Sequence, residues 1–260
     1  MKKSISITIL LILAILLVSC SSKDNLDSSN MELETDEITQ NNEEQELEDP
    51  KEIESTREID NNDFESQEPM ELSKEGLKEI NIFLSNFTEV YLGDFSDELD
   101  NDSLINFAVR HTDINNFEAI NIDGHTGYLD KSIVERNIKK YFGDDVHVEH
   151  SKTERYKFNG NSYEIIMADG DIAPMAIVSE MYDSEDGTYI VFFKEIRAYD
   201  VDVLDYSSSV EDVENALVKT PDEIDIISLK RAVVKRHNFE GKERYMLIKY
   251  ETIERYMGGY

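Results

Sequence analysis

The sequence predicts an α+β domain, made of three helices followed by antiparallel hairpins, in the part of the chain after Pro69. Between residues 77 and 141, apolar residues recur at spacings of three and four, which is the pattern of amphipathic helices. From residue 155 onward, apolar runs flank turn sequences such as Asn159-Gly160-Asn161, which is typical of hairpins. Helices that precede hairpins predict a helix layer packed on an antiparallel sheet.

The first helix is expected over residues 74–92. Ser73 is its expected N-cap, Leu72 and Leu77 form a hydrophobic staple, and Gly93 is the expected C′ residue. The apolar face of this helix carries Leu77, Ile80, Leu84, Phe87 and Tyr91.

Two further helices are expected before the hairpins. The second opens near Asn101 or Asp102, and the third begins at a capping box of Ser132 and Glu135. One short strand is expected between them, within residues 117–129. The apolar faces carry Leu104, Phe107, Ala108 and His111 in the second helix, and Ile133, Val134, Ile138 and Tyr141 in the third, which ends at Gly143.

Three hairpins are expected in the C-terminal half of the chain. Their strands are 155–158 with 162–168, 174–182 with 188–199, and 229–237 with 243–253, and each pair flanks a turn that contains glycine. Between the second and third hairpins, a short helix is expected near residues 210–218, followed by a capping box at Thr220-Pro221-Asp222-Glu223.

This order of elements over residues 72–260 resembles the cystatin-like or NTF2-like cone, in which helices pack into the concave side of a strongly curved sheet. Two stretches, Leu84-Ser85-Asn86-Phe87 and residues 138–143, also resemble uncharacterised domains of secreted and lipid-anchored proteins of low-GC Gram-positive bacteria. These resemblances imply a fold and an extracytoplasmic location, and they imply no activity.

The N-terminus has the pattern of a bacterial export signal. Lys2 and Lys3 form a positive n-region, and residues 5–18 are apolar except for Ser6 and Thr8. This apolar stretch is shorter than the ~20 residues that a membrane-spanning helix needs.

The apolar stretch ends in Leu17-Val18-Ser19-Cys20, which resembles the lipobox of bacterial lipoproteins. That resemblance implies that residues 1–19 are a signal peptide and that Cys20 receives a diacylglyceryl group and becomes the first residue of the mature chain. Two acyl chains hold a protein stably on a membrane, where one chain binds reversibly. We therefore expect a lipid-anchored protein on the outer face of the cell membrane, with an ordinary secretory signal or an uncleaved anchor as the alternatives.

An acidic segment follows the lipobox. Residues 21–70 contain 18 acidic and three basic residues, a net charge of −15, with Phe64 as the one aromatic residue. So little apolar surface does not offset the entropy of ordering, and residues 20–71 are expected to be a disordered tether. As a neutral coil it would span roughly 35–42 Å, and self-repulsion extends it further.

The composition excludes several classes of protein. The whole chain has 57 acidic and 26 basic residues, a net charge of −31, so binding to nucleic acid through its phosphates is not expected. The single cysteine rules out an internal disulfide framework and a cysteine-rich zinc site. Nucleophile-elbow, phosphate-loop and dinucleotide motifs are all missing from the sequence, so no catalytic residue and no cofactor are expected.

Three histidines raise the question of a metal site. His147-Val148-Glu149-His150 lacks the spacing of a helical zinc motif, and on an extended segment its two histidines point to opposite sides. Surface histidines are expected there, and His111 is expected as a hydrogen-bonded core histidine. No metal site is therefore predicted.

Charged clusters give weaker signals. Acidic residues are concentrated in two connections, 94–102 and 183–187, and either weak calcium binding or solvated turns would explain them. A basic cluster, Lys230, Arg231, Lys235 and Arg236, either grips an anionic wall polymer or a carboxylate, or pairs with acidic neighbours across the sheet, and we expect the second.

These observations predict a non-catalytic binding or assembly module at the cell surface, whose partners are the membrane through Cys20 and a cell-wall polymer or another surface protein. An extracytoplasmic hydrolase acting on cell-wall material is the alternative, and a cleft with two buried carboxylates about 5–10 Å apart would favour it. The solute-binding protein of a transporter is a third class, but the βαβ alternation it needs is missing. A pocket lined by Tyr91, Tyr128 and Tyr163 would indicate a small ligand.

Overall fold

The computed structural model describes residues 67–256, except 167–171, 185 and 201–202. The predicted signal peptide (1–19), Cys20 and nearly all of the predicted tether lie outside the described residues. No helix in the described part of the chain is both long enough and apolar enough to cross a bilayer.

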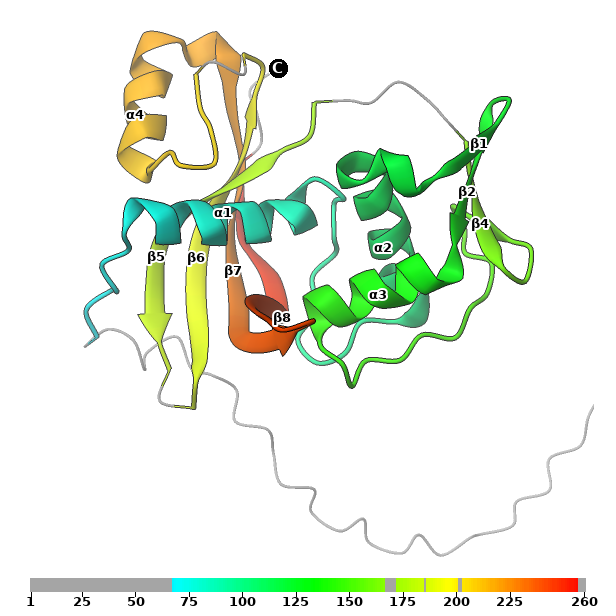
Figure 1. The fold of residues 1–260 in the computed structure, drawn as a ribbon. Coiled ribbons are helices and arrows are strands. Elements are labelled where there is room, and N and C mark those ends of the chain that lie inside the picture. The colour runs from blue at the N-terminus through cyan, green and yellow to red at the C-terminus, as the bar shows by residue number, and fades with distance from the viewer. Residues whose placement is uncertain (1–66, 167–171, 185, 201–202, 257–260) are drawn as a thin grey trace, which may run out of the picture. The chain divides into compact units, whose positions relative to one another are not determined.

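The described chain is an α+β fold, as predicted, with its strands in two antiparallel sheets (Figure 1). The larger sheet is a meander of β5 (Met175–Asp183), β6 (Thr188–Ala198), β7 (Ile224–Phe239) and β8 (Lys242–Arg255), in that order. The smaller sheet has the order β1-β2-β4-β3 and consists of β1 (Asn121–Asp123), β2 (Thr126–Asp130), β4 (Ser162–Ile166) and β3 (Lys157–Phe158). The prediction of a single sheet is wrong, because the apolar pattern of the sequence does not show which hairpins belong to the same sheet.

The three expected hairpins are all present. The β7–β8 hairpin is the longest, and its turn residues Glu240 and Gly241 both have positive φ, 51° and 77°. Two left-handed residues in a two-residue turn match the right-handed twist of the strands that they join. Residues 117–129, where one short strand was expected, contain a 3-10 turn and the hairpin β1–β2 instead.

Helix α1 (Lys74–Thr88) lies across the larger sheet (Figure 1), and the side chain of Ser73 caps it by accepting a hydrogen bond from the Gly76 amide, as predicted. Two of its polar side chains fasten it to β5. Asn81 accepts a hydrogen bond from the Val178 amide at 2.9 Å, and the Ser85 hydroxyl accepts one from Ala176 at 2.8 Å. These bonds occupy amides of β5 that would otherwise be buried without partners.

Helices α2 (Asn101–Asn115) and α3 (Lys131–Phe142) are both present as predicted. Helix α2 begins at Asn101, as expected, whereas the cap of α3 differs from the prediction. Asp100 caps α2, and Asp130 rather than Ser132 caps α3, accepting a hydrogen bond from the Ser132 amide. A carboxylate one or two residues upstream therefore takes the capping position in both helices. The capping box expected at residues 220–223 is also wrong, because those residues form a 3-10 turn without a side-chain cap.

Helix α4 (Val210–Lys219) has a capping box, formed by Ser209 and Asp212, and packs on a small apolar cluster of its own. The main core lies between α1, α2, α3 and both sheets and is rich in aromatic rings. Phe87 is central to it, with the rings of Phe83, Phe107, Phe142, Tyr141 and Tyr250 within 6.1 Å of its own.

Candidate functional site

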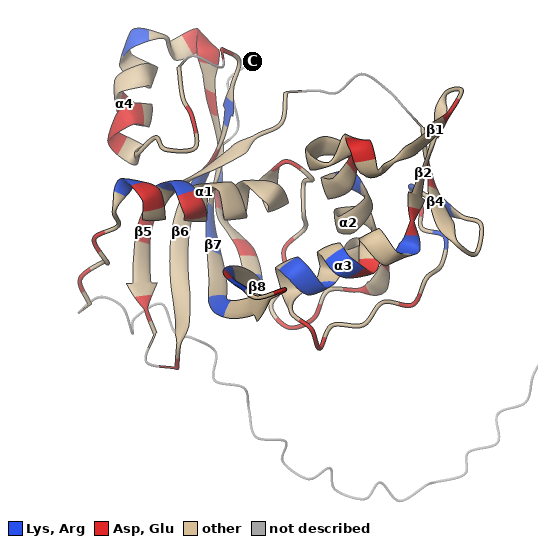
Figure 2. Ribbon diagram, viewed as in Figure 1, with Lys and Arg blue, Asp and Glu red and all other residues tan. Residues whose placement is uncertain are grey.

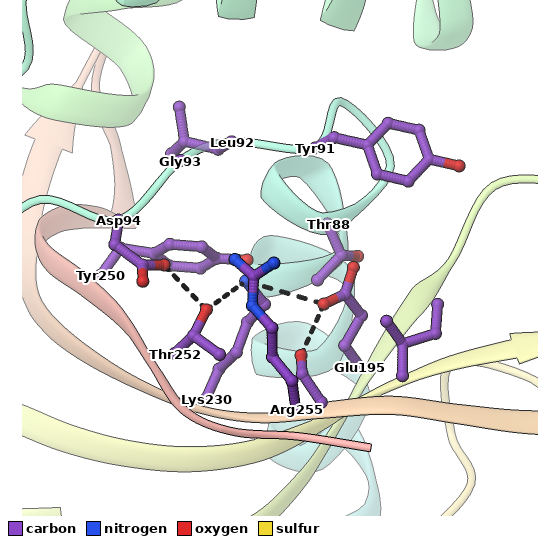
Figure 3. Close-up of a pocket in the computed structure, with 12 residues that line it drawn as sticks. Thr88, Tyr91, Leu92, Gly93, Asp94, Glu195, Lys230, Tyr250, Thr252 and Arg255 are labelled. Carbon is purple, nitrogen blue, oxygen red and sulfur yellow. Dashed lines mark hydrogen bonds and ion pairs between the residues drawn. The ribbon is translucent and has the colours of Figure 1, made fainter. Parts of the chain in front are cut away.

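A pocket of about 270 Å³ lies between the C-terminal end of α1 and the strands β6, β7 and β8 (Figure 3). Residues 88–94 form one wall, and the larger sheet supplies the floor with Glu195, Ser228, Lys230, Tyr250 and Thr252. The pocket is unusual in that charged and hydroxyl side chains point from a sheet into a region where the neighbouring strand positions are apolar.

The C-terminal end of α1 forms the wall of the pocket, and it contains a residue with a strained backbone, Tyr91. The amide of Leu92 bonds to the carbonyl of Phe87, and the amide of Tyr91 bonds to that of Thr88, which is the Schellman pattern. Tyr91 therefore takes the left-handed conformation, with φ of 57°, at a position that glycine normally occupies. The predicted helix end at residue 92 and the predicted C′ role of Gly93 are wrong by a few residues for this reason.

Tyr91 is exposed, and Figure 3 shows its ring pointing away from Lys230 and Thr252. The guanidinium of Arg110 lies 5.5 Å from the centre of this ring, and Arg197 donates a hydrogen bond to its hydroxyl at 3.3 Å. Strained backbone persists where surrounding contacts hold it, and it is common at ligand sites.

Glu195 and Lys230 form a buried ion pair in the floor of the pocket. Their side chains are 8% and 9% exposed, and Lys230 Nζ lies 3.6 Å from Glu195 Oε2. The same carboxylate oxygen accepts a 2.6 Å hydrogen bond from Ser228. A buried charge is tolerated when it is paired and hydrogen-bonded, as both of these are.

The network continues from Lys230 to the rim of the pocket. Lys230 Nζ donates to the Thr252 hydroxyl at 3.2 Å, and that hydroxyl donates to Asp94 Oδ1 at 2.8 Å (Figure 3). Asp94 is exposed, so the chain of contacts runs from a buried carboxylate to a solvated one. Lys230 also lies 4.7 Å from the centre of the Tyr250 ring, in cation–π contact.

Two irregularities in the sheet aim these side chains. The register between β6 and β7 shifts at Glu195/Ile196, and that between β7 and β8 shifts at Leu229/Lys230. A bulge turns a strand and redirects the side chain beside it, and bulges are common next to functional sites. Both members of the buried ion pair thus sit at a bulge.

The hydroxyl of Tyr250 is the least expected group in the pocket. Tyr250 is fully buried, and its hydroxyl has no hydrogen-bond partner among the described residues. Burial, and then the charges of Glu195 and Asp94, raise the pKa of Tyr250, so the hydroxyl stays protonated. A buried hydroxyl without a partner costs free energy, which makes it a donor held ready for an acceptor.

Arg255 lines the same pocket near the end of β8, and its guanidinium makes no hydrogen bond or ion pair with the described residues. The pocket therefore offers an exposed cation, an exposed carboxylate and a buried donor. Such a set suits a small polar molecule with both donors and acceptors.

The basic cluster predicted from the sequence is divided between two faces of β7. Lys230 pairs with Glu195, Arg231 with Glu251 at 2.5 Å, and Arg236 with Glu79 at 2.6 Å. Three of its four members therefore pair with acidic neighbours, as expected, and they form no single patch.

His147 and His111 lie as the sequence predicts, but the expectation that His150 is a surface histidine is wrong, because its side chain is only 13% exposed. His150 has both ring nitrogens in contact, with the Tyr163 hydroxyl and with Glu135, each at 2.8 Å, and His147 is exposed. His111 is a buried core histidine that stacks on Phe107 and has Glu89 3.7 Å away. Among the described residues no three His, Cys, Asp or Glu side chains are grouped as metal ligands.

Several acidic residues of the two acidic connections, 94–102 and 183–187, have partners within the protein. Asp94 accepts from Thr252, Asp100 caps α2, and Asp186 accepts from the Thr188 amide and hydroxyl. The three tyrosines that would have indicated a small ligand if they lined one pocket are separated. Tyr91 lines the pocket, while Tyr128 and the fully buried Tyr163 belong to the smaller sheet.

Sequence reasoning missed Glu195, Ser228, Tyr250 and Arg255. Glu195 and Lys230 carried a usable signal, because each is a charged residue at a core-facing position of a strand that is otherwise apolar. No signal in the sequence shows that the Tyr250 hydroxyl lacks a hydrogen-bond partner, because this depends on the packing of three strands and a helix end.

Comparison with known proteins adds nothing to this geometry. No family model, curated protein or solved structure matches the chain significantly.

Proposed function

We propose that this chain is a lipid-anchored protein of the outer face of the membrane, whose α+β domain binds a small polar ligand in the pocket at the end of α1. The observation that carries the binding function is the buried hydroxyl of Tyr250, which has no partner among the described residues and lines a pocket of about 270 Å³. Peptides and sugars from cell-wall material offer the acceptors and donors that this pocket needs.

The proposed anchor rests on the sequence of the N-terminus. Residues 17–20 supply a lipobox with the one cysteine of the chain at the position that accepts lipid. A lipid anchor followed by a long acidic tether suits a domain that must reach its ligand at a distance from the bilayer. Palmitate labelling of cells tests the anchor: the wild-type chain takes up label and Cys20→Ala takes up none, whereas labelled Cys20→Ala protein contradicts it.

We also propose the finer resemblance to cystatin-like or NTF2-like cones. Its support is that α1 crosses a four-stranded meander and that each pair of neighbouring strands in this meander has a register shift. Bulges of this kind increase the twist and bend of strands, which is what a cone requires. An experimental structure with a flat larger sheet would contradict this proposal.

The hydrolase alternative has one observation in its favour, since Glu195 and Asp94 line the same pocket. Glu195 is held by Lys230 and Ser228, and Asp94 is exposed rather than buried, so the arrangement of two buried carboxylates is not formed. We therefore favour binding without turnover.

Calorimetry and mass spectrometry together separate the two functions. The full-length chain, purified in detergent, is titrated with muropeptides, short peptides and oligosaccharides, and the mass of each compound is measured after incubation. The binding function predicts retention of at least one compound with unchanged mass. A change in mass that is lost in Glu195→Gln, with the fold intact, would establish the hydrolase instead.

A further inference from the structure

A second pocket, of about 230 Å³, lies where α1, α3 and β8 meet, away from the site described above. Lys140 and Tyr141 of α3 line it together with Arg244 and Tyr245 of β8 and Phe83 of α1. Two carboxylates, Glu79 and Glu243, belong to the same lining. Figure 2 shows Lys and Arg residues along α3 and on the neighbouring end of the larger sheet. This position is notable because residues 71–260 carry a net charge of −18.

Two cations of this pocket have no carboxylate partner among the described residues. Lys140 Nζ donates to the Tyr141 hydroxyl at 2.9 Å and lies 4.5 Å from the centre of that ring. Arg244 makes no side-chain hydrogen bond with the described residues, and its Nε is buried.

The nearby carboxylates are committed to other cations. Glu240 accepts two hydrogen bonds from Arg136, at 2.8 and 2.7 Å, and Glu79 accepts two from Arg236, at 2.6 and 3.1 Å. Glu243 is 72% exposed, and its nearest cation is Arg236 at 4.0 Å. The four cations of this region, Lys140, Arg244, Arg136 and Arg236, thus face three carboxylates, Glu79, Glu240 and Glu243. Lys140 and Arg244 are the two of these cations that form no ion pair among the described residues.

Burial and the neighbouring charges both act on the ammonium of Lys140. Burial, followed by the charges of Arg244 and Arg136 and opposed by Glu240, lowers the pKa of Lys140 to about 8. The chain has 57 acidic residues, yet none of those described forms an ion pair with Lys140 or Arg244. A bound anion would stabilise the charged form of both side chains.

We propose that this second pocket binds a phosphate group, held by the ammonium of Lys140 and the guanidinium of Arg244. Two unpaired cations match the charge of about −1.5 to −2 that a phosphate monoester carries near pH 7. The planar guanidinium binds phosphate oxygens through paired hydrogen bonds, and the ammonium supplies a compact charge beside it. The volume suits one such group with a small substituent.

Calorimetric titration of the full-length chain in neutral detergent, at constant ionic strength, tests this site with inorganic phosphate as the probe. We expect saturable binding that Arg244→Gln weakens by about tenfold or more, because the charge-assisted hydrogen bonds of the guanidinium are lost. Lys152→Gln, which removes an exposed lysine, is the matched control and should leave the affinity unchanged. Binding that is absent at 20 mM phosphate, or equally weakened by Lys152→Gln, overturns the proposal.

A second readout needs no variant. Carbon NMR of the lysine side chains follows the titration of Lys140, whose pKa should rise from about 8 when phosphate binds. An unchanged titration in saturating phosphate overturns the proposal even if Arg244→Gln fails to fold.

Three further ligands distinguish the sources of the phosphate. Glycerol 1-phosphate that binds like inorganic phosphate indicates a small monoester, and tighter binding of poly(glycerol phosphate) indicates a wall polymer. Acetate that binds as tightly as phosphate overturns the assignment to a doubly charged anion. The effect of Arg244→Gln and the titration of Lys140 report on this pocket and not on the Tyr250 pocket, so this site and the proposed function fail or succeed separately.

Discussion

Replacing Tyr250 by phenylalanine should stabilise the protein, although most substitutions in a core do the opposite. The ring of Tyr250 packs against Phe87 and Phe193, with centroid distances of 6.1 and 5.9 Å, and phenylalanine keeps both contacts. Only the hydroxyl is lost, and that hydroxyl is buried without a hydrogen-bond partner among the described residues.

The magnitude follows from the cost of burying an unpaired polar group, about 1–3 kcal/mol. We expect the free energy of unfolding of Tyr250→Phe to rise by about 1 kcal/mol, the lower end of that range, because the substituted protein also relaxes. In a domain of this size such a gain raises the melting temperature by about 2–4 °C.

Tyr163→Phe is the matched control for this experiment. Tyr163 is equally buried, but its hydroxyl lies 2.8 Å from Nδ1 of His150. Removing it leaves a ring nitrogen without its partner, so we expect a loss of about 1–3 kcal/mol. Urea unfolding followed by circular dichroism measures both variants. A Tyr250→Phe protein that loses 1 kcal/mol or more would show that this hydroxyl has a partner, and the reasoning would be wrong.

Three more predictions concern other parts of the domain. Glu195→Gln should cost about 3–5 kcal/mol of stability in urea unfolding, because it leaves Lys230 buried without its counterion, and adding Lys230→Met should restore part of the loss. Burial lowers the pKa of His111, so on acidification the unfolded state takes up a proton before the folded state does. The free energy of unfolding should therefore be smaller at pH 5.5 than at pH 7.5. The His111→Gln variant should lack this contribution to the pH dependence. Gly143→Ala should lower the melting temperature, because Gly143 has φ of 105° and a Cβ there would lie 3.2 Å from Sδ of Met246. A Gly143→Ala protein that melts at the wild-type temperature would contradict the account of Gly143. Losses of stability that simply add in the Glu195 and Lys230 double variant would contradict the account of the ion pair. An unchanged pH dependence of stability in His111→Gln would contradict the account of His111.

Local signals in the sequence were sufficient for the elements of the fold. Ser73 caps α1, glycine-containing turns join the strands of the three expected hairpins, and the 3.6-residue pattern located α1, α2 and α3, because each of these features depends on neighbours within a few residues. The expected order, three helices followed by hairpins, is wrong, because the β1–β2 hairpin precedes α3. The division into two sheets could not be predicted, because strand order depends on contacts between distant segments.

The candidate site was harder to predict for the same reason. Tyr91 and Lys230 were noticed as an aromatic residue and as part of a basic cluster, but their neighbours in space, Glu195 and Tyr250, lie far from Tyr91 in the sequence. The left-handed conformation of Tyr91 also escaped notice, because glycine two residues later is the usual signal for a helix end. Positions that break such local rules are where functional sites are expected.

The most direct test of the binding function compares the wild-type chain with Tyr250→Phe in calorimetric titrations of the same muropeptides, peptides and sugars. If the pocket binds a polar ligand through the Tyr250 hydroxyl, the wild type retains at least one compound with its mass unchanged. The Tyr250→Phe protein, although more stable, then binds that compound about tenfold less tightly or worse, because the donor that the ligand acceptor requires is gone. Equal affinity of the two proteins for every retained compound would contradict the account.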